Sequence, residues 1–168
     1  MIIDDNFLHD DQKKWLDHIF ESRRYKFEFV RSADKENDNA NHFQHIVLDR
    51  RGDQGSPLKD GLYHILYTFC RKHNVSCSKI FRCTINIFPP IKDSYKCGIH
   101  TDHPFTHNQL LIYLNDSSGD TGVTDKSHET VLQLVEPKKY RGFFFKDYPH
   151  FFYYPNSGLR KVALFTFI

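Results

Sequence analysis

The chain has 168 residues, of which 39% are hydrophobic and 15% aromatic. This length suits one ordinary domain, with a core large enough to fold without disulfides or a structural metal. Its 23 basic and 21 acidic residues nearly balance, which argues against nucleic acid or an anionic membrane as an obligatory partner.

The first half of the chain is expected to form two helices set among short strands. An amphipathic helix, capped by Asp10 or Asp11, is predicted to run to about Ser22. A second helix is predicted to open at Pro57 and to run to about His73. The strands expected around them are residues 1–8, Tyr25–Val30 and Phe43–Leu48, and polar loops or turns are expected at Arg31–Asn41 and Arg50–Gly55.

After the second helix, the apolar pattern changes from a period of about 3.6 residues to a period of about 2. The strands predicted there are Lys79–Phe88, Gly98–Asp102, Asn108–Leu114, Val131–Glu136, Arg141–Phe145, His150–Tyr154 and Lys161–Phe167. Turn-rich segments such as NDSSGDTG and PNSG separate them, which is typical of a sandwich or barrel. The sequence therefore predicts one mainly β domain over residues 1–168, with two N-terminal helices packed on an antiparallel double sheet.

The spacing of the cysteines and the N-terminal sequence indicate the cellular compartment in which the protein is expected. Cys70, Cys77, Cys83 and Cys97 contain no C-x-x-C pair, so zinc-ribbon spacing and a dense disulfide framework are both absent. The first residues, MIIDDNFLHDDQKKW, carry acids where a signal peptide has a basic region. No run approaches the roughly 20 apolar residues of a membrane span. We expect a soluble, cytoplasmic protein.

An H-x-D triplet at His100 and Asp102 is the strongest chemical signal. On the predicted strand Gly98–Asp102, side chains two positions apart share a face, so His100 and Asp102 converge. A second histidine would complete the 2-His-1-carboxylate triad that holds non-haem iron(II), and His150 is the candidate. The chain has 11 histidines, so chance alone can also produce an H-x-D triplet. The alternative is a hydrogen-bonded strand histidine beside an acid.

Two more side chains are candidates for binding a small dicarboxylate. Arg160 follows the PNSG turn, ten residues after His150, and an arginine there could hold a carboxylate by a bidentate fork. A surface arginine is the alternative and the commoner case. Tyr113 lies in NQLLIYLND, where its hydroxyl suits a carboxylate neighbour, although an ordinary core tyrosine fits the spacing as well.

The remaining histidine groups are expected to be structural or solvent-exposed. His42 and His45 would share a face only on a helix, and their segment is predicted to be a strand or loop. Pro104 breaks any helical pairing of His103 with His107. A polar loop, DKSHE, holds the last of these residues, His128.

Two stretches, GIHTDHPFTHNQLLIYLNDSSGDTGV and YPHFFYYPNSGLRKVALFTF, resemble the 2-oxoglutarate/iron(II)-dependent oxygenases of the prolyl-4-hydroxylase-like superfamily. The resemblance covers residues 80–168 and rests on H-x-D, IYLN, a Gly-x-Thr turn, a distal histidine and a basic residue ten positions later. Two positions depart from the pattern. Asn86 and Phe88 stand where many relatives carry a tyrosine, and the usual Gly-Gly-x-Thr turn reads Gly119-Asp120-Thr121.

The resemblance implies a double-stranded β-helix (jelly-roll) core over residues 79–168, supported by residues 1–75. By matching position, it implies that His100, Asp102 and His150 bind Fe(II). Arg160 and Tyr113 would bind the far carboxylate of the cosubstrate 2-oxoglutarate. The implied reaction couples oxidative decarboxylation of 2-oxoglutarate by O2 to hydroxylation of a substrate C–H bond.

The substrate and two rival hypotheses stay open. A prolyl or other side chain in a polypeptide is the first hypothesis, and a free amino acid or small metabolite the second. Mixed charges in the segments Pro89–Cys97, Asp116–Glu129 and Arg31–Asn41 favour a polar or peptide partner. The rivals are a cupin-like iron or zinc enzyme without 2-oxoglutarate, and a catalytically silent jelly-roll binding module. Oligomeric state is not predicted.

Overall fold

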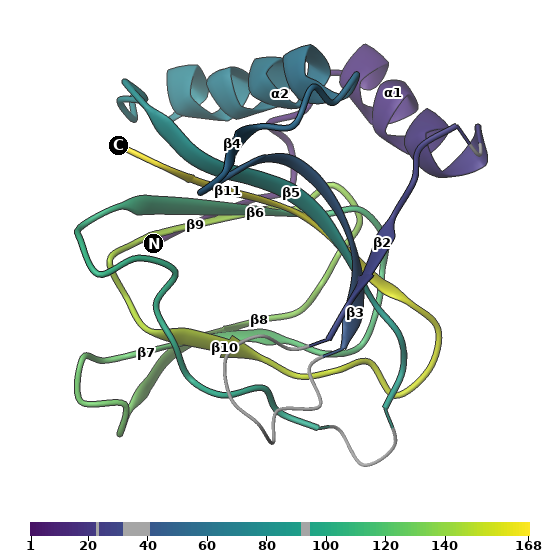
Figure 1. Ribbon diagram of the computed structural model, residues 1–168. Coiled ribbons are helices and arrows are strands. Elements are labelled where there is room, and N and C mark those ends of the chain that lie inside the picture. The colour runs from purple at the N-terminus through teal and green to yellow at the C-terminus, as the bar shows by residue number, and fades with distance from the viewer. Residues whose placement is uncertain (23, 32–40, 92–94) are drawn as a thin grey trace.

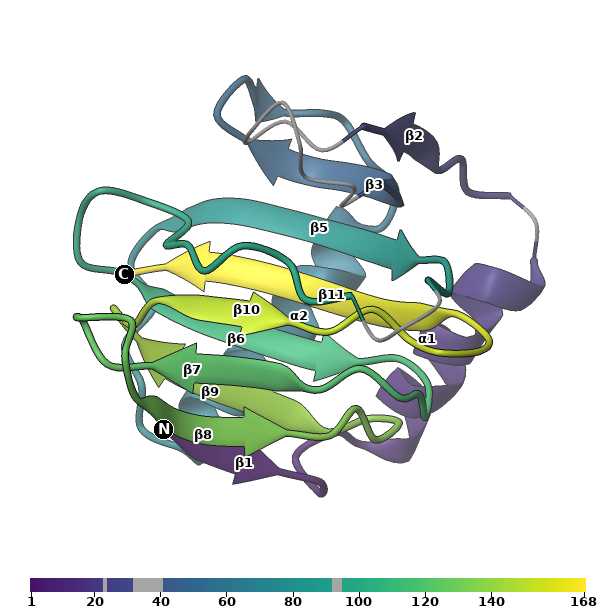
Figure 2. The ribbon, with the colours of Figure 1, turned by 90° about the horizontal axis from the view of Figure 1, so that it is seen from below.

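The protein, described from a computed structural model over residues 1–22, 24–31, 41–91 and 95–168, consists of two facing β-sheets and two helices. The helices cover the outer face of the larger sheet, and the smaller sheet faces its inner side (Figure 1). Seen from below in Figure 2, the smaller sheet lies in front of the larger one, with the helices behind both. Most of the expected loop Arg31–Asn41, and part of Pro89–Cys97, lie outside the described residues.

Both predicted helices are confirmed. The first, α1 (Asp10–Glu21), begins one residue after its N-cap His9, whose backbone N–H donates to the Gln12 side chain at 3.0 Å. Asp10 therefore lies in the first turn, where its charge favours the helix dipole, and is not the cap that the sequence predicted. The second helix, α2 (Lys59–Lys72), buries a face that includes Leu62, Ile65, Leu66 and Phe69.

The larger sheet has the strand order β1-β9-β6-β11-β5-β3-β2, with β4 paired to β3. Every pairing in it is antiparallel. Its strands are β1 (Ile2–Asp4), β2 (Glu28–Val30), β3 (His42–Asp49), β4 (Gly52–Asp53), β5 (Ile80–Phe88), β6 (Asn108–Tyr113), β9 (Gly142–Lys146) and β11 (Arg160–Phe167).

The smaller sheet has the strand order β10-β7-β8 and is also antiparallel. Its strands are β7 (Thr121–Thr124), β8 (Val131–Val135) and β10 (His150–Phe152). Two isolated bridges, Lys96 to Tyr153 and His100 to His150, place the segment before the H-x-D triplet beside β10. This double sheet of antiparallel strands confirms the predicted jelly-roll core.

Strand alternation divides the buried residues into two clusters. On β11, Ala163 and Phe165 face the helices, whereas Val162 and Leu164 face the space between the sheets. The inner cluster is rich in aromatic side chains and also contains Tyr113 of β6. Polar side chains at these inward positions therefore lie among apolar side chains in the space between the two sheets, which is called the chamber below.

Two sequence predictions about strands were wrong. Gly98–Asp102 is not a strand: only His100 forms a bridge, and the chain bends at Asp102. In contrast, part of the predicted loop Asp116–Glu129 forms β7, a fully buried strand. The sequence TGVT of β7 holds a single large apolar residue, Val123, so it carries too little alternation to predict a strand.

At 12 and 14 residues, α1 and α2 are shorter than a bilayer span. Among the described residues, no helix has the length and apolarity needed to cross a membrane.

Candidate functional site

The structure brings His100, Asp102 and His150 together between the two sheets. His100 and His150 exchange backbone hydrogen bonds of 3.0 and 2.9 Å, and their ring centroids lie 4.5 Å apart. The Oδ2 atom of Asp102 lies 3.7 Å from Nε2 of His150. Asp102 thus reaches the same place as His100 without the strand geometry that the sequence predicted, because the chain bends there.

Hydrogen bonds to their other atoms orient two of these side chains. His100 Nδ1 lies 2.9 Å from the carbonyl oxygen of Gly98, which only accepts, so Nδ1 carries the proton and Nε2 keeps its lone pair. Arg82 of β5 donates from Nη1 to Asp102 Oδ1 at 2.8 Å. The other carboxylate oxygen, Oδ2, is buried and has no hydrogen-bond partner among the described residues.

Burial and neighbouring charges set the protonation states of the two most buried groups. Burial alone would raise the pKa of Asp102, but the nearby His150 and Arg82 lower it, and the net pKa falls below the usual range. Burial and His100 lower the pKa of His150 to about 4, against the opposing charge of Asp102. A carboxylate and a neutral imidazole are the forms that bind a metal ion.

This donor set fits a divalent metal ion. Buried polar atoms almost always have partners, so the unpartnered Oδ2 of Asp102 is an unusual feature that a bound cation would satisfy. Two imidazoles and one carboxylate are also the donor set of non-haem iron. In the described ranges, no three His, Cys, Asp or Glu side chains are already arranged as they would be around a metal ion. The fit therefore depends on the types of donor atom and on the buried Oδ2 atom.

A buried arginine lies at the other end of the chamber. Arg160, at the start of β11, is 2% exposed. Its Nε donates to the Gly119 carbonyl oxygen at 3.1 Å, and its guanidinium carbon lies 4.8 and 5.3 Å from the ring centres of Phe152 and Phe88. None of the described carboxylates forms an ion pair with it. Burial lowers its pKa. Because a buried cation costs several kcal/mol to desolvate, an anionic ligand is expected here.

Thr121 connects Arg160 to Tyr113. The Tyr113 hydroxyl, fully buried, donates to Thr121 Oγ1 at 2.7 Å, and Nη2 of Arg160 donates to the same oxygen at 2.8 Å. Burial raises the pKa of Tyr113, so its hydroxyl stays a donor. Two donors that converge on one oxygen could equally bind a carboxylate oxygen. The sequence assigned no role to Thr121 beyond its place in a Gly-x-Thr turn.

Strand register relates the arginine end to the histidine end. His150 pairs with Val123 and Phe152 pairs with Thr121, so all four residues share one face of the smaller sheet. Thr121 is two strand positions from Val123, or about 7 Å along the strand. A small dicarboxylate can span this separation.

Two further polar residues, to which the sequence assigned no role, face the same space between the sheets. Gln109 of β6 places its amide nitrogen 3.3 Å from Nε2 of His150, and its buried Oε1 has no partner among the residues described. Asn86, at one of the positions that depart from the family pattern, accepts a 2.9 Å hydrogen bond from Gln44 of β3. These contacts join strands far apart in sequence, so no local pattern indicates them. Lys161, next to Arg160, faces the opposite side, with Nζ 4.3 Å from the Phe20 ring centre.

Two surface hollows lie away from the three clustered residues. One, of about 390 Å³, lies against α2 and is lined by residues that include Tyr67 and Arg71. The other, of about 260 Å³, lies against Gly119, Asp120 and Tyr153. The candidate site is therefore identified by its chemistry and by the unpartnered buried atoms, not by the size of a surface hollow.

No protein-family model and no curated protein matches the sequence, whereas solved structures match the fold. An oxidoreductase of the 2OG-Fe(II) oxygenase family from Burkholderia pseudomallei has a TM-score of 0.76 at 15% identity, over 95% of this chain and 80% of that one. A prolyl hydroxylase from Trichoplax adhaerens, solved with a hypoxia inducible factor peptide fragment, has a TM-score of 0.65 at 17% identity, over 99% and 82%. A Pseudomonas putida prolyl-4-hydroxylase has a TM-score of 0.64 at 13% identity, over 99% and 91%. The chain therefore has the fold of the 2-oxoglutarate/Fe(II) oxygenases, prolyl hydroxylases among them.

Proposed function

We propose that the protein is an Fe(II)- and 2-oxoglutarate-dependent dioxygenase that hydroxylates a C–H bond of its substrate. His100, Asp102 and His150 would hold the iron, and Arg160 and Tyr113 would bind 2-oxoglutarate. The observation that carries the proposal is the pair of buried polar groups between the two sheets. One is a carboxylate oxygen beside two imidazoles, with no hydrogen-bond partner among the described residues, and the other is a buried arginine that forms no ion pair with a described carboxylate.

Fe(II), when bound, supplies the activation of O2 and the oxidative decarboxylation of 2-oxoglutarate. The protein's own contribution is to orient the ligands. The Gly98 carbonyl holds the His100 ring with Nε2 free, and Arg82 holds one oxygen of Asp102 so that the other stays available. Such supporting hydrogen bonds typically account for a factor of about 10–100 in metal affinity.

Arg160 and Tyr113 would neutralise and orient the far carboxylate of 2-oxoglutarate. The Phe88 and Phe152 rings beside the guanidinium keep water away, which strengthens an ion pair between arginine and carboxylate. Thr121 Oγ1, which now accepts from both donors, would share them with the ligand. The cupin-like alternative without 2-oxoglutarate assigns no ligand to this buried cation.

For the substrate, we propose a prolyl or other side chain of a polypeptide. Two observations support this choice: prolyl hydroxylases are among the structures with this fold, and one of them was solved with a peptide fragment. A free amino acid or small metabolite is the second candidate class.

The test is succinate formation by the purified protein given 2-oxoglutarate and O2, with Fe(II) supplied or withheld. The proposal requires Fe(II)-dependent succinate, its inhibition by N-oxalylglycine, and stimulation by at least one proline-containing peptide with a mass gain of one oxygen atom. Absence of Fe(II)-dependent succinate under all conditions would favour the silent binding module. Stimulation by free amino acids alone would favour the second substrate class.

A further inference from the structure

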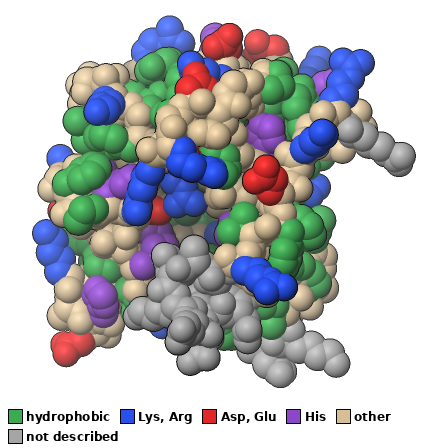
Figure 3. Space-filling view, viewed as in Figure 1, with side chains coloured by type: hydrophobic (Ala, Val, Ile, Leu, Met, Phe, Trp, Pro, Cys, Tyr) green, Lys and Arg blue, Asp and Glu red, His purple; other side chains and the backbone are tan. Residues whose placement is uncertain are grey.

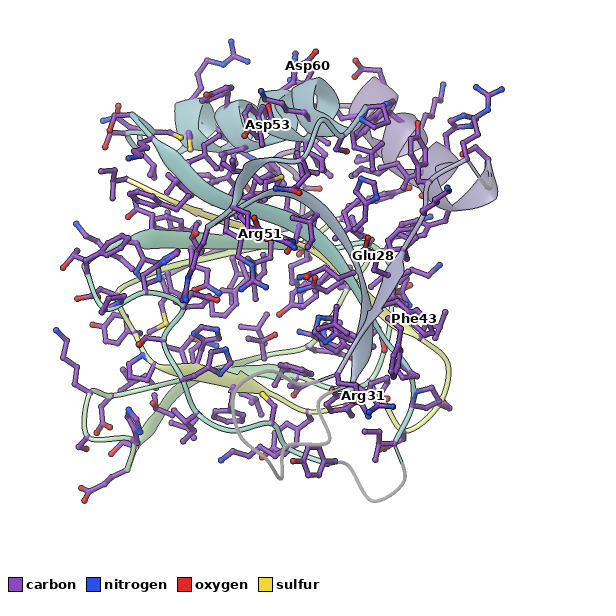
Figure 4. The ribbon with its side chains drawn as sticks, in the orientation of Figure 1. Glu28, Arg31, Phe43, Arg51, Asp53 and Asp60 are labelled. Atoms are coloured by element: carbon purple, nitrogen blue, oxygen red, sulfur yellow. The ribbon has the colours of Figure 1, made fainter. Side chains whose placement is uncertain are left out.

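The tip of a β-hairpin carries two arginines beside the candidate metal site. Asp49 pairs with Gly52 where β3 turns into β4, which leaves Arg50 and Arg51 as the two-residue tip. Arg50 Nη2 lies 3.5 Å from the backbone carbonyl oxygen of Asp102. Figure 4 labels Arg51 on this hairpin, and at the same place in Figure 3 Lys and Arg side chains gather beside histidines.

Of the three arginines near Asp102, which are Arg50, Arg51 and Arg82, Arg50 is the one without an ion pair among the described residues. Arg51 forms an ion pair of 2.8 Å with Asp49, and Arg82 forms one of 2.8 Å with Asp102. Arg50 is exposed and forms no ion pair with the carboxylates of the described residues. Its one hydrogen bond to a described residue, at 3.5 Å, is weak, so its donors are available to a ligand. The surface formed by Arg50 and residues Asp102–Phe105, beside the candidate metal site, is called the entrance below.

The hairpin tip is held in place without Arg50. The Asp49 carboxylate accepts from the Arg51 backbone N–H at 2.9 Å, and the Gln54 side chain donates to the Gly52 carbonyl oxygen at 2.8 Å. Gly52 has a φ of +100°, a conformation that suits glycine. A substitution at Arg50 should therefore change the charge at the entrance without unfolding the turn.

Aromatic side chains flank the same entrance. The rings of Phe81, His103 and Phe105 pack together, with centroid separations of 4.9 to 5.6 Å. Phe105 is 44% exposed, and His103 directly follows Asp102, whose backbone carbonyl oxygen lies 3.5 Å from Arg50. The entrance therefore offers apolar area next to one available cation, a combination typical of peptide-binding surfaces.

We propose that Arg50 binds an acidic side chain of a peptide substrate, near the residue that is hydroxylated. This inference rests on the proposed function and adds a charge preference to it. Nucleic acid is the less suitable partner, because its readers neutralise several phosphates, whereas here one of the three arginines is uncompensated and the net charge of the chain is only +2.

The experiment compares three short acetylated peptides that have one central proline and are otherwise identical. Glutamate, glutamine or lysine flanks the proline. Wild-type protein with Fe(II) and 2-oxoglutarate is expected to turn over the glutamate peptide with the highest kcat/KM, about two- to fivefold above the glutamine peptide, as for one exposed ion pair. Arg50→Ala should remove this preference, and Arg50→Glu should shift it to the lysine peptide. Arg71→Ala, an exposed arginine on α2 across the sheet, should keep the wild-type order.

Fluorescence anisotropy of the labelled glutamate peptide gives a readout that does not need turnover. Wild-type protein should bind it more tightly than the glutamine peptide, and Arg50→Ala should bind both equally. If peptides stimulate the wild type but Arg50→Ala keeps the glutamate preference, the role of Arg50 is wrong and the proposed function stands. If no peptide binds or is turned over, or if only a single-stranded oligonucleotide stimulates turnover, the peptide substrate class and this inference both fail.

Discussion

Arg82 donates to one oxygen of Asp102 across 2.8 Å, and the other oxygen of the same carboxylate is buried with no hydrogen-bond partner in the part of the chain that the structure describes. Arg82 lies on β5 and Asp102 at the bend after the His100 bridge, so two separate segments meet at this carboxylate. The arrangement leaves one carboxylate oxygen available in a fixed direction. It makes Arg82 a positioning residue for the proposed iron ligand.

Arg82→Gln should therefore weaken metal binding by about 10- to 100-fold. The cause is the loss of the charged donor that fixes the carboxylate. The measurement is titration calorimetry with Mn(II) or Co(II) under argon, which does not depend on activity. Arg71→Gln on α2 is the control and should bind metal like the wild type. Equal metal affinity in Arg82→Gln and wild type would show that Asp102 needs no such support.

The sequence predicted the strands with clear alternation and missed the contacts between distant strands. Alternation on β11 and the helical spacing on α2 were sufficient to predict these two elements. The roles of Arg82 and Thr121 were not predictable, because their partners Asp102 and Arg160 meet them only through the register of the folded sheets. Local patterns carry no such information.

The three proposed ligands should be indispensable for turnover. His100→Ala, Asp102→Ala and His150→Ala are each expected to abolish Fe(II)-dependent succinate formation. Each removes one of the three donors of the proposed site. His128→Ala, on an exposed loop, should retain wild-type succinate formation. Wild-type turnover by His150→Ala would contradict the proposed ligand set.

Metal-free protein should lose stability as the pH falls from about 6.5 to about 4. Burial and His100 lower the pKa of His150 from 6.5 to about 4, and the charge of Asp102 opposes them. In this window the unfolded chain binds a proton that the folded chain does not, so the free energy of unfolding falls with pH. The loss is on the order of 3 kcal/mol, at about 1.4 kcal/mol per pKa unit.

Urea unfolding of the metal-stripped protein at several pH values measures this effect. His150→Gln should flatten the slope between pH 4 and 6.5, whereas His128→Gln should keep it. Asp102 does not contribute to this slope. Its pKa is lowered from the ordinary value of 3.8, so the stability that its charge contributes is lost below this window. An unchanged slope in His150→Gln would assign the pH dependence to other groups.

Removing the metal should leave the fold intact. The apolar clusters on the two sides of the larger sheet do not include the proposed ligands, so they do not depend on metal binding. Chelated protein should keep its circular dichroism spectrum and melt cooperatively. Added Fe(II) should raise the melting midpoint only by mass action. Unfolding on chelation would instead indicate a structural metal.

Arg160 and Lys161 are neighbours in sequence on opposite faces of β11, which makes them a matched pair. Arg160→Met should weaken 2-oxoglutarate binding by one to several orders of magnitude. Breaking a buried charge pair costs about 2–5 kcal/mol, and each 1.4 kcal/mol is roughly tenfold. Lys161→Met changes a side chain that lies over the Phe20 ring, so it should bind 2-oxoglutarate like the wild type.

The thermal stability of the ligand-free protein distinguishes a role of Arg160 in binding 2-oxoglutarate from a role in stabilising the fold. Arg160 is buried among aromatic rings, and none of the described carboxylates pairs with it. Replacing a buried, unpaired cation by an apolar side chain of similar volume should therefore leave the melting midpoint unchanged or raise it. Thermal melts with and without 2-oxoglutarate, in the presence of Mn(II), test both points. A large loss of stability in ligand-free Arg160→Met would mean that the arginine stabilises the fold and is not reserved for binding an anion.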